Sequence, residues 1–191
     1  MSDQDLEVRS FYDRPTVIQG LDVDPHRDPD EPPAAEAEEV AAEAASWRPA
    51  KSLIALRDQV NARFPERKKD SDGTIGDVRH CGHPGATSDH CPRNIDGDVG
   101  VVTAIDITHD PAHGCDAGKL AEAIRVSHDP RVKYIISDRR IANFQAIGGA
   151  APWDWRPYNG DNPHTKHVHI SVRPVKQGAS SYDSTASWSI T

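Results

Sequence analysis

The chain has 191 residues, of which 36% are hydrophobic, and a formal net charge of −8 at pH 7. This length allows one well-packed domain plus a tail, and the low hydrophobic content indicates that part of the chain is not packed. No stretch is long and apolar enough to cross a bilayer as a helix, so we expect no membrane partner. The first residues are acidic and precede no apolar segment, so we expect no signal peptide.

The negative charge is concentrated near the N-terminus. Residues 1–46 carry 13 acidic residues and three arginines, whereas the remainder carries 17 acidic and 19 basic residues. The first segment is rich in Asp, Pro, Ala and Glu, so we expect an acidic, largely disordered tail. A folded domain is expected over residues 47–176, followed by a C-terminal extension over residues 177–191 in which Tyr182 and Trp188 pack back on the domain. Because this domain is near neutral and has no basic stripe, nucleic acid is not an expected partner.

Hydrophobic spacing and capping residues predict two helices. Apolar residues recur at helical spacing over residues 52–64, so we expect a helix there that stops at Pro65. Asp116 can cap a second helix that runs to about Ser127.

Three β-like runs predict strands over residues 101–108, 133–138 and 167–173. The segments 68–89 and 141–163 are too long for simple connections, so we expect them to line a cleft. The predicted fold class is therefore α+β, with a small antiparallel β-sheet flanked by helices and joined by long loops.

The three cysteines, Cys81, Cys91 and Cys115, are an odd number, so at least one thiol is free or paired outside the chain. We expect unpaired thiols. Two alternatives stay open: a disulfide between Cys81 and Cys91, and a second, structural zinc site formed by these two cysteines with His83.

The segment that begins at His164 contains three imidazoles within six residues. On a strand, side chains alternate between faces, so His167 and His169 project from one side while Val168 points into the opposite layer. Two histidines side by side on one strand face indicate metal ligation combined with proton transfer.

A carboxylate and a further histidine complete a candidate metal site. Asp106 lies in the middle of a Val/Ile-rich strand, where a buried carboxylate must be paired or bound to a cation. Together with His90 and His169 it would give three ligands of His/Asp/His type. The fourth tetrahedral position would then be open to water, as in catalytic zinc sites.

Three short motifs resemble a family of zinc peptidases: Ser88-x-His90, Ala104-x-Asp106 and His167-x-His169. The family groups lysostaphin, the D-Ala-D-Ala peptidases and the hedgehog signalling domain, and its pattern reads S-x-H, G-x-A-x-D and a late H-x-H or E-x-W-H. With His164 included, the late motif looks like that of the penicillin-insensitive murein endopeptidases. Residues 155–164 resemble phage and actinobacterial endolysin peptidases of the same group. The resemblance covers roughly residues 50–175 and implies a hedgehog/D-Ala-D-Ala-peptidase-like fold with one catalytic zinc ion on a sheet face.

The chain departs from the family pattern in its spacing. His90 and Asp106 lie sixteen positions apart, further than in the family's compact form, so residues 91–100 are expected to bulge out as an inserted loop. Val102 also stands where the family usually has Gly.

The late motif implies the catalytic roles. Lys166 stands where the E-x-W-H form has its Glu, which assigns the chain to the H-x-H branch. In that branch the first histidine, His167, does the acid–base work. His164 could hydrogen-bond the attacking water or stabilise the developing oxyanion.

The resemblance implies a peptidoglycan substrate, whose stem peptides bear free carboxylates that arginines bind well. The expected substrate contacts are Arg139, Arg140, Arg156 and Tyr158. Without an export signal, a wall-degrading enzyme needs lysis or a dedicated pore to reach its substrate. This favours a monomeric phage endolysin that is made in the host cytoplasm and acts on the cell wall after release.

Two other functions stay open. Hedgehog relatives show that this scaffold can lose hydrolysis, so a non-catalytic domain that binds cell wall or a protein partner is one alternative. An HNH-type metal-dependent nuclease is the other, suggested by Asp89-His90 followed by Pro92, although that motif needs its Pro one residue later. The peptide bond is also open among D-Ala–mDAP endopeptidase, D-Ala-D-Ala carboxypeptidase and L-Ala–D-Glu endopeptidase activities.

Overall fold

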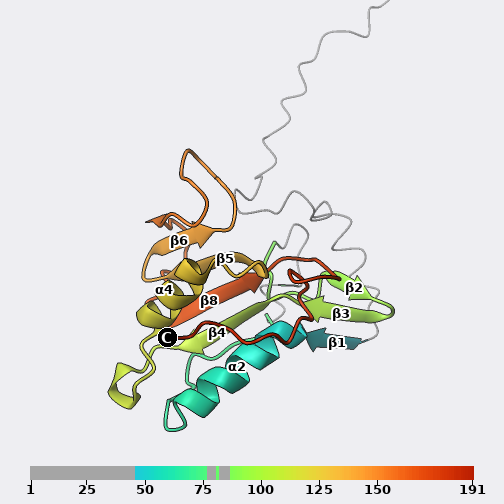
Figure 1. Cartoon of the computed structure of the whole chain (residues 1–191). Helices are drawn as coiled ribbons and strands as arrows, with labels where there is room; N and C mark the ends of the chain where they lie inside the picture. Colours follow the sequence, from blue (N-terminus) through green and yellow to red (C-terminus); the bar gives the residue numbers. More distant parts are fainter. Residues whose placement is uncertain (1–45, 77–80, 82–86) are drawn as a thin grey trace, which may run out of the picture.

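A computed structural model describes residues 46–76, 81 and 87–191 of the chain. The acidic tail predicted for residues 1–46 lies outside the described residues except for Ser46. In the described part, two helices and two β-sheets form a mixed α+β arrangement (Figure 1). Within this part, no helix combines the length and apolar character that a membrane crossing needs.

The larger sheet has five antiparallel strands in the order β4-β8-β5-β6-β7. Strand β8 lies inside the sheet between β4 and β5, as Figure 1 shows. The strands are β4 (Ala104–Thr108), β5 (Val132–Ser137), β6 (Arg140–Asn143), β7 (Arg156–Pro157) and β8 (His167–Val172).

A second sheet of three strands lies beside the first, in the order β1-β3-β2. Its strands are β1 (Ser46–Pro49), β2 (Asn94–Asp96) and β3 (Val99–Val102), with β1 parallel and β2 antiparallel to β3. The segment 91–100, expected to bulge out as an inserted loop, therefore contributes a hairpin that belongs to a sheet.

The single strand predicted over residues 101–108 is wrong, because the structure divides it at Thr103. The Thr103 N–H donates to the Asp89 carbonyl at 3.1 Å, and its own carbonyl accepts from the Val172 N–H at 2.8 Å. Since the backbone of Thr103 is hydrogen-bonded to two different segments, the chain leaves one sheet there and enters the other.

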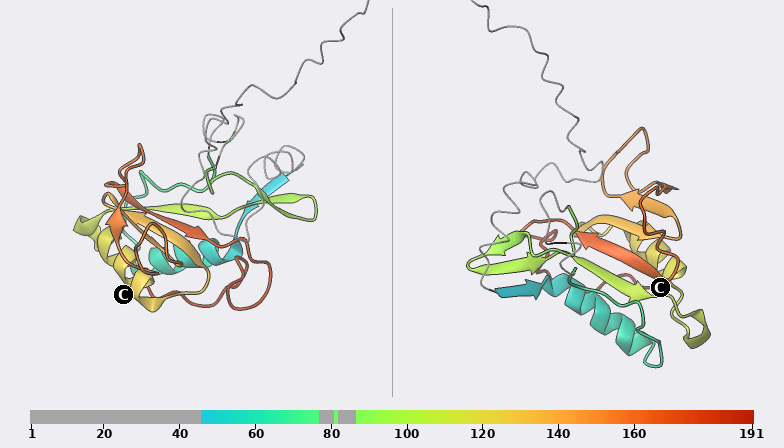
Figure 2. Two further views of the ribbon diagram at one scale, coloured as in Figure 1. Left: turned by 90° about the horizontal axis from the view of Figure 1, so that it is seen from above. Right: turned by 180° about the vertical axis from the view of Figure 1, so that it is seen from behind.

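Both predicted helices are confirmed, as α2 (Lys51–Arg63) and α4 (Ala117–Ser127), and a 3-10 helix spans Pro111–His113. The Asp116 carboxylate accepts hydrogen bonds from the first backbone N–H groups of α4, as its capping role requires. Figure 2 shows both helices on the same side of the larger sheet. Their apolar faces and one face of the sheet form the main core, which includes Leu53, Leu56, Val60, Ile105, Ile107, Leu120, Ile124, Ile135, Val168 and Ile170.

The prediction of a long loop over residues 141–163 is wrong in part, because this segment contains most of β6 and all of β7. Strand β6 follows β5 through a two-residue turn, in which Asp138 and Arg139 both have positive φ values of 46° and 61°. Such turns usually carry Asn-Gly, Asp-Gly or Gly-Gly. Because Arg139 stands where these pairs have Gly, the sequence lacks the usual sign of a hairpin.

The segment after β8 returns across the helical side of the domain, and Tyr182 and Trp188 pack into the main core as expected. The indole N–H of Trp188 donates to the Ser52 carbonyl at 2.8 Å. The Arg131 guanidinium carbon lies 3.8 Å from the Trp188 ring centroid, within cation–π range.

Candidate metal centre

Three side chains from distant parts of the chain meet on the face of the larger sheet that the helices leave uncovered. They are His90, Asp106 on β4 and His169 on β8. His169 Nδ1 lies 3.0 Å from Asp106 Oδ1 and 3.1 Å from His90 Nε2, and His90 Nε2 lies 3.3 Å from Asp106 Oδ2. The three residues expected as metal ligands are therefore brought together around one point.

Strand pairing explains how two of these side chains meet. In the register of β4 against β8, Asp106 lies directly opposite His169. Side chains alternate along both strands, so neighbours such as Ile107 and Val168 point into the core, where they are fully buried. The face opposite the core thus receives the polar side chains.

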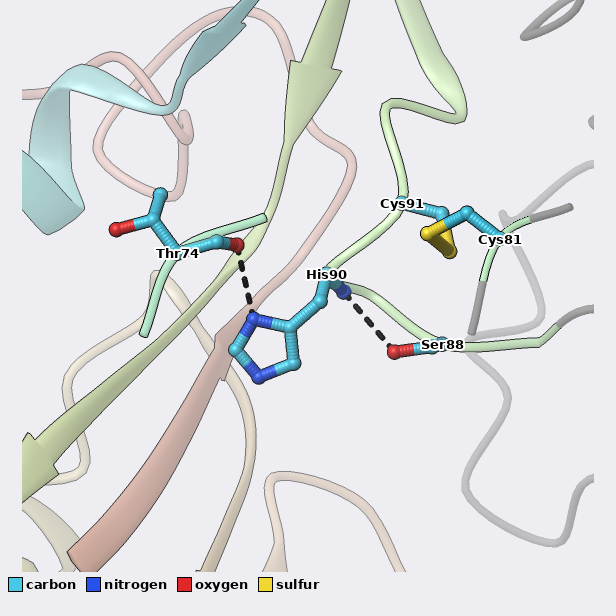
Figure 3. Close-up of a disulfide and its surroundings, with 5 residues drawn as sticks. All are labelled: Thr74, Cys81, Ser88, His90 and Cys91. Atoms are coloured by element: carbon cyan, nitrogen blue, oxygen red, sulfur yellow. Dashed lines mark hydrogen bonds between the residues drawn. A yellow bond between two sulfur atoms is a disulfide. The ribbon is translucent and has the colours of Figure 1, made fainter. Parts of the chain in front are cut away.

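His90 reaches the same point from a turn, held by backbone and disulfide contacts (Figure 3). Its Nδ1 lies 2.8 Å from the Thr74 carbonyl oxygen, and its backbone N–H donates to Ser88 Oγ at 3.3 Å. A carbonyl oxygen only accepts, so Nδ1 carries a ring proton, and Nε2, which faces Asp106 and His169, is the nitrogen left to bind a metal ion.

The three cysteines form one disulfide and leave one buried thiol, so the expectation of unpaired thiols is wrong. Cys81 and Cys91 form a disulfide, with their Cα atoms 5.5 Å apart, and Cys91 directly follows His90 in the sequence. This pairing also removes the alternative in which both cysteines, with His83, bind zinc, and His83 itself lies outside the described residues. Cys115 is free and fully buried, and burial raises the pKa of its thiol.

Asp106 is also held from the open edge of β4. Its backbone N–H donates to the Gly73 carbonyl at 2.8 Å, and the Gly73 N–H donates back to the Asp106 carbonyl at 3.2 Å. A Cβ atom added to Gly73 would lie 3.1 Å from Asp106 Oδ2. Only glycine therefore allows this close approach without moving the carboxylate.

Hydrogen bonding and charge favour the ionised form of Asp106. Burial raises its pKa, but hydrogen bonds and charge from His169 and His90 outweigh this, so the pKa of Asp106 lies well below its usual range. Burial lowers the pKa of His90, yet the Asp106 carboxylate outweighs burial and holds that pKa above its ordinary value. The site thus stabilises positive charge at its centre.

The geometry suits a divalent metal ion. Ligand atoms at tetrahedral bond lengths of about 2.0–2.1 Å from a metal lie about 3.3 Å from one another. The two imidazole nitrogens lie 3.1 Å apart, and they lie 3.0 Å and 3.3 Å from the two oxygens of the Asp106 carboxylate, which is close to this spacing. The set of two imidazole nitrogens and one carboxylate oxygen matches borderline-soft divalent ions. The three side chains could therefore hold one such ion and leave a coordination position open.

Two further histidines border this centre. The His164 and His167 ring centroids lie 5.0 Å apart, and His167 Nε2 lies 3.8 Å from Asp106 Oδ1. In the described part of the chain, neither nitrogen of His167 nor Nδ1 of His164 has a hydrogen-bond partner. Burial, together with the neighbouring His169 and His167, lowers the pKa of His164 to about 4, and burial lowers the pKa of His167. Both rings are therefore neutral at pH 7, and each has at least one ring nitrogen without a hydrogen-bond partner among the described residues.

These two histidines also form a second candidate group with Asp106, whose ligand atoms lie within 4.8 Å of one another. The separation of 3.8 Å between His167 Nε2 and Asp106 Oδ1 exceeds the 3.0, 3.1 and 3.3 Å separations given above for the first group. The first group is the tighter fit to a single ion.

A cavity of about 500 Å³ opens over the centre, and its lining includes His90, Asp106, His164, His169 and Tyr158. Of the expected substrate contacts, Tyr158 thus lies in this cavity. Among the described residues, no arginine or lysine lines it, and Asp161 adds a carboxylate to its wall.

The three arginines expected to bind substrate lie elsewhere. Arg140 lines a neighbouring cavity of about 300 Å³ that it shares with His164 and His167. Arg156 donates to Asn143 Oδ1 at 3.0 Å, and Arg139 is exposed in the turn between β5 and β6. Their role in substrate binding stays a prediction.

Several residues at the site have no signature in the sequence. Thr74 contributes only its carbonyl, which any residue could supply, and Gly73 acts through its missing side chain. Tyr134 stacks on His169 with ring centroids 5.4 Å apart, but its aromatic ring in a β-like run is equally typical of a core.

None of the protein families, curated proteins or solved structures compared with this chain matches it.

Proposed function

We propose that this protein is a zinc-dependent peptidase that cleaves peptidoglycan stem peptides or cross-links, with the fold of the lysostaphin, D-Ala-D-Ala peptidase and hedgehog group. The observation that carries the proposal is the convergence of His90 Nε2, Asp106 and His169 Nδ1 within 3.3 Å of one another, beneath an open cavity. Two His and one Asp with a free coordination position are typical of catalytic zinc rather than structural zinc.

The neighbouring histidines supply the remaining chemistry. A zinc ion held by the three ligands would polarise the peptide carbonyl and lower the pKa of water toward about 7. His167 is neutral and has unpaired nitrogens beside Asp106, so it accepts the proton of the attacking water and returns it to the leaving amine. His164, on the cavity wall, hydrogen-bonds the water or the developing oxyanion.

The substrate assignment and the setting extend the same proposal. The cavity of about 500 Å³ admits an extended peptide segment, with Tyr158 on its wall. As a phage endolysin, the protein would act as a monomer on the cell wall after release from the host cytoplasm. The Cys81–Cys91 disulfide suits this setting, because disulfides are stable in an oxidising exterior.

Two variants test the proposal. His169→Ala should abolish both zinc content and hydrolysis of purified sacculi, whereas His167→Ala should retain zinc and lose turnover by at least about a hundredfold. His113→Ala, which changes an exposed histidine on the 3-10 helix, is the matched control and should behave as the wild type.

Zinc is measured by elemental analysis, and the released muropeptides are identified by mass spectrometry, which also reveals the bond that is cut. Normal hydrolysis by the His167 variant would refute its assigned role. Zinc binding without any hydrolysis by the wild type would instead indicate the non-catalytic binding domain.

A further inference from the structure

A buried ion pair lies directly behind the metal centre. Lys133 Nζ lies 3.1 Å and 3.2 Å from the two carboxylate oxygens of Asp89, and both side chains are at most 4% exposed. Pairs this deep cost much to desolvate and seldom stabilise a fold more than packed apolar residues would. The location of this pair therefore indicates a role in orienting its neighbours.

A β-bulge in β5 gathers the donors around Asp89. Val132 pairs with Val172 but Tyr134 pairs with Ser171, so β5 has one residue more than β8 across this interval. Such a bulge turns consecutive side chains toward the same side of a sheet. Asp89 accordingly accepts hydrogen bonds from both Lys133 and Tyr134.

Ser171 links Asp89 to a metal ligand. The Ser171 hydroxyl donates to the Asp89 carboxylate, which can only accept, so its single proton is already committed. Ser171 Oγ must then accept at its other contact, which is His169 Nε2 at 2.9 Å. A ring proton of His169 is thereby held on Nε2, and Nδ1, which faces Asp106 and His90, is the nitrogen left to bind a metal ion.

We propose that Asp89, Lys133, Ser171 and Tyr134 form a positioning network that fixes the tautomer and ring plane of His169 for metal binding. Stacking of Tyr134 on His169, with 11° between the ring planes, restrains the ring further. Asp89 also precedes His90 in the chain, so one buried carboxylate anchors the segment of one ligand and the imidazole of another. This inference rests on the metal centre of the proposed function, and none of the four residues is catalytic.

Ser171→Ala in the full chain is the direct test, because it removes the link while leaving the Asp89–Lys133 pair intact. Zinc affinity, measured by competition with a chelator, should fall about 10- to 100-fold, as for other partners of metal-bound histidine. The visible absorption of the cobalt(II)-substituted protein should also change, since that spectrum reports ligand geometry. Ser171→Thr retains a hydroxyl and should bind zinc more tightly than Ser171→Ala.

Ser52→Ala is the matched control, because Ser52 is also fully buried but its hydroxyl has no partner among the described residues. It should leave affinity and spectrum unchanged. Tyr134→Phe is a second variant, which removes one donor to Asp89 and retains the stacking, and it should weaken zinc binding less than Ser171→Ala. Far-UV circular dichroism verifies that each variant is folded.

If a folded Ser171→Ala protein has the same zinc affinity and the same cobalt spectrum as the wild type, the proposed network is refuted. The readout needs no peptide substrate, so it is separable from the proposed activity. If the wild type binds zinc but cuts no peptidoglycan, the peptidase assignment is refuted. The zinc affinities of the variants would still test the proposed network. A wild type that binds neither ion would refute both.

Discussion

The segment that carries Gly73 and Thr74 is anchored by another buried ion pair, whose removal gives a quantitative test. The Arg67 side chain is fully buried, and its guanidinium donates to Asp72 Oδ1 at 2.8 Å and Oδ2 at 2.6 Å. Asp72 Oδ1 also accepts from the N–H and the hydroxyl of Thr108, at the end of β4. The pair thus holds this segment against the strand that bears Asp106.

Asp72→Asn preserves the volume of the side chain but leaves the Arg67 charge buried without a counter-charge. Breaking a buried pair by removing one partner costs about 3–5 kcal/mol. Asp72 is 21% exposed, so water recovers part of this cost and we expect about 3 kcal/mol, at the lower end of that range. With a denaturant slope of about 2 kcal/mol per M, the urea midpoint should fall by about 1.5 M.

The assay is equilibrium urea unfolding at pH 7, with Asp70→Asn as the control, since Asp70 is exposed on the same segment. Adding Arg67→Met to the Asp72→Asn variant should recover much of the loss, because no unpaired charge then remains. Equal stability of the Asp72 and Asp70 variants would refute this reasoning.

The same pair sets a dependence on pH. Burial raises the pKa of Asp72, but hydrogen bonds from Arg67 and Thr108 outweigh it and hold that pKa below its ordinary value. A carboxylate with a depressed folded-state pKa stabilises the protein above its unfolded-state pKa, and the contribution is lost as the pH falls through the folded-state pKa. The difference between wild type and Asp72→Asn should therefore shrink below about pH 4.

Two further predictions concern the surroundings of the metal centre. Gly73→Ala should weaken zinc binding about tenfold in a chelator competition, because the new Cβ displaces the Asp106 carboxylate; unchanged affinity would contradict this. Reduction of the Cys81–Cys91 disulfide, which closes a loop over ten positions, should lower the free energy of unfolding by about 2–3 kcal/mol. Thermal unfolding with and without reductant measures this effect, and reductant should have no such effect on a Cys81→Ser/Cys91→Ser variant.

The sequence predicts those parts of the site that depend on local pattern. Asp106 stands out because a carboxylate in a β-branched strand needs a cation, and the alternation of a strand places His167 and His169 on one face. The Ser88-x-His90 motif indicates His90. That these side chains meet depends on the pairing of β4 with β8, which the sequence leaves unspecified and the structure supplies.

Other parts depend on contacts that no local pattern reveals. The partner of Asp89 is Lys133, 44 positions away, and their meeting requires a bulge that leaves no mark in the sequence. The sequence does not predict strand β6 for a related reason, since the turn before it, at Asp138 and Arg139, adopts positive φ without glycine. The Cys81–Cys91 bond likewise follows from the approach of two backbones rather than from the count of cysteines.

The packing of the last residues determines how this protein can be shortened. A truncation at residue 176, the domain boundary that composition suggests, would delete Tyr182 and Trp188 from the main core, together with the hydrogen bond from Trp188 to the Ser52 carbonyl in α2. It would also remove Asp183, whose carboxylate accepts from the Lys51 N–H at the start of that helix. Since Ile190 also packs against the core, expression vectors should retain the chain through Ile190, whereas the exposed Thr191 is a suitable attachment point for an affinity tag.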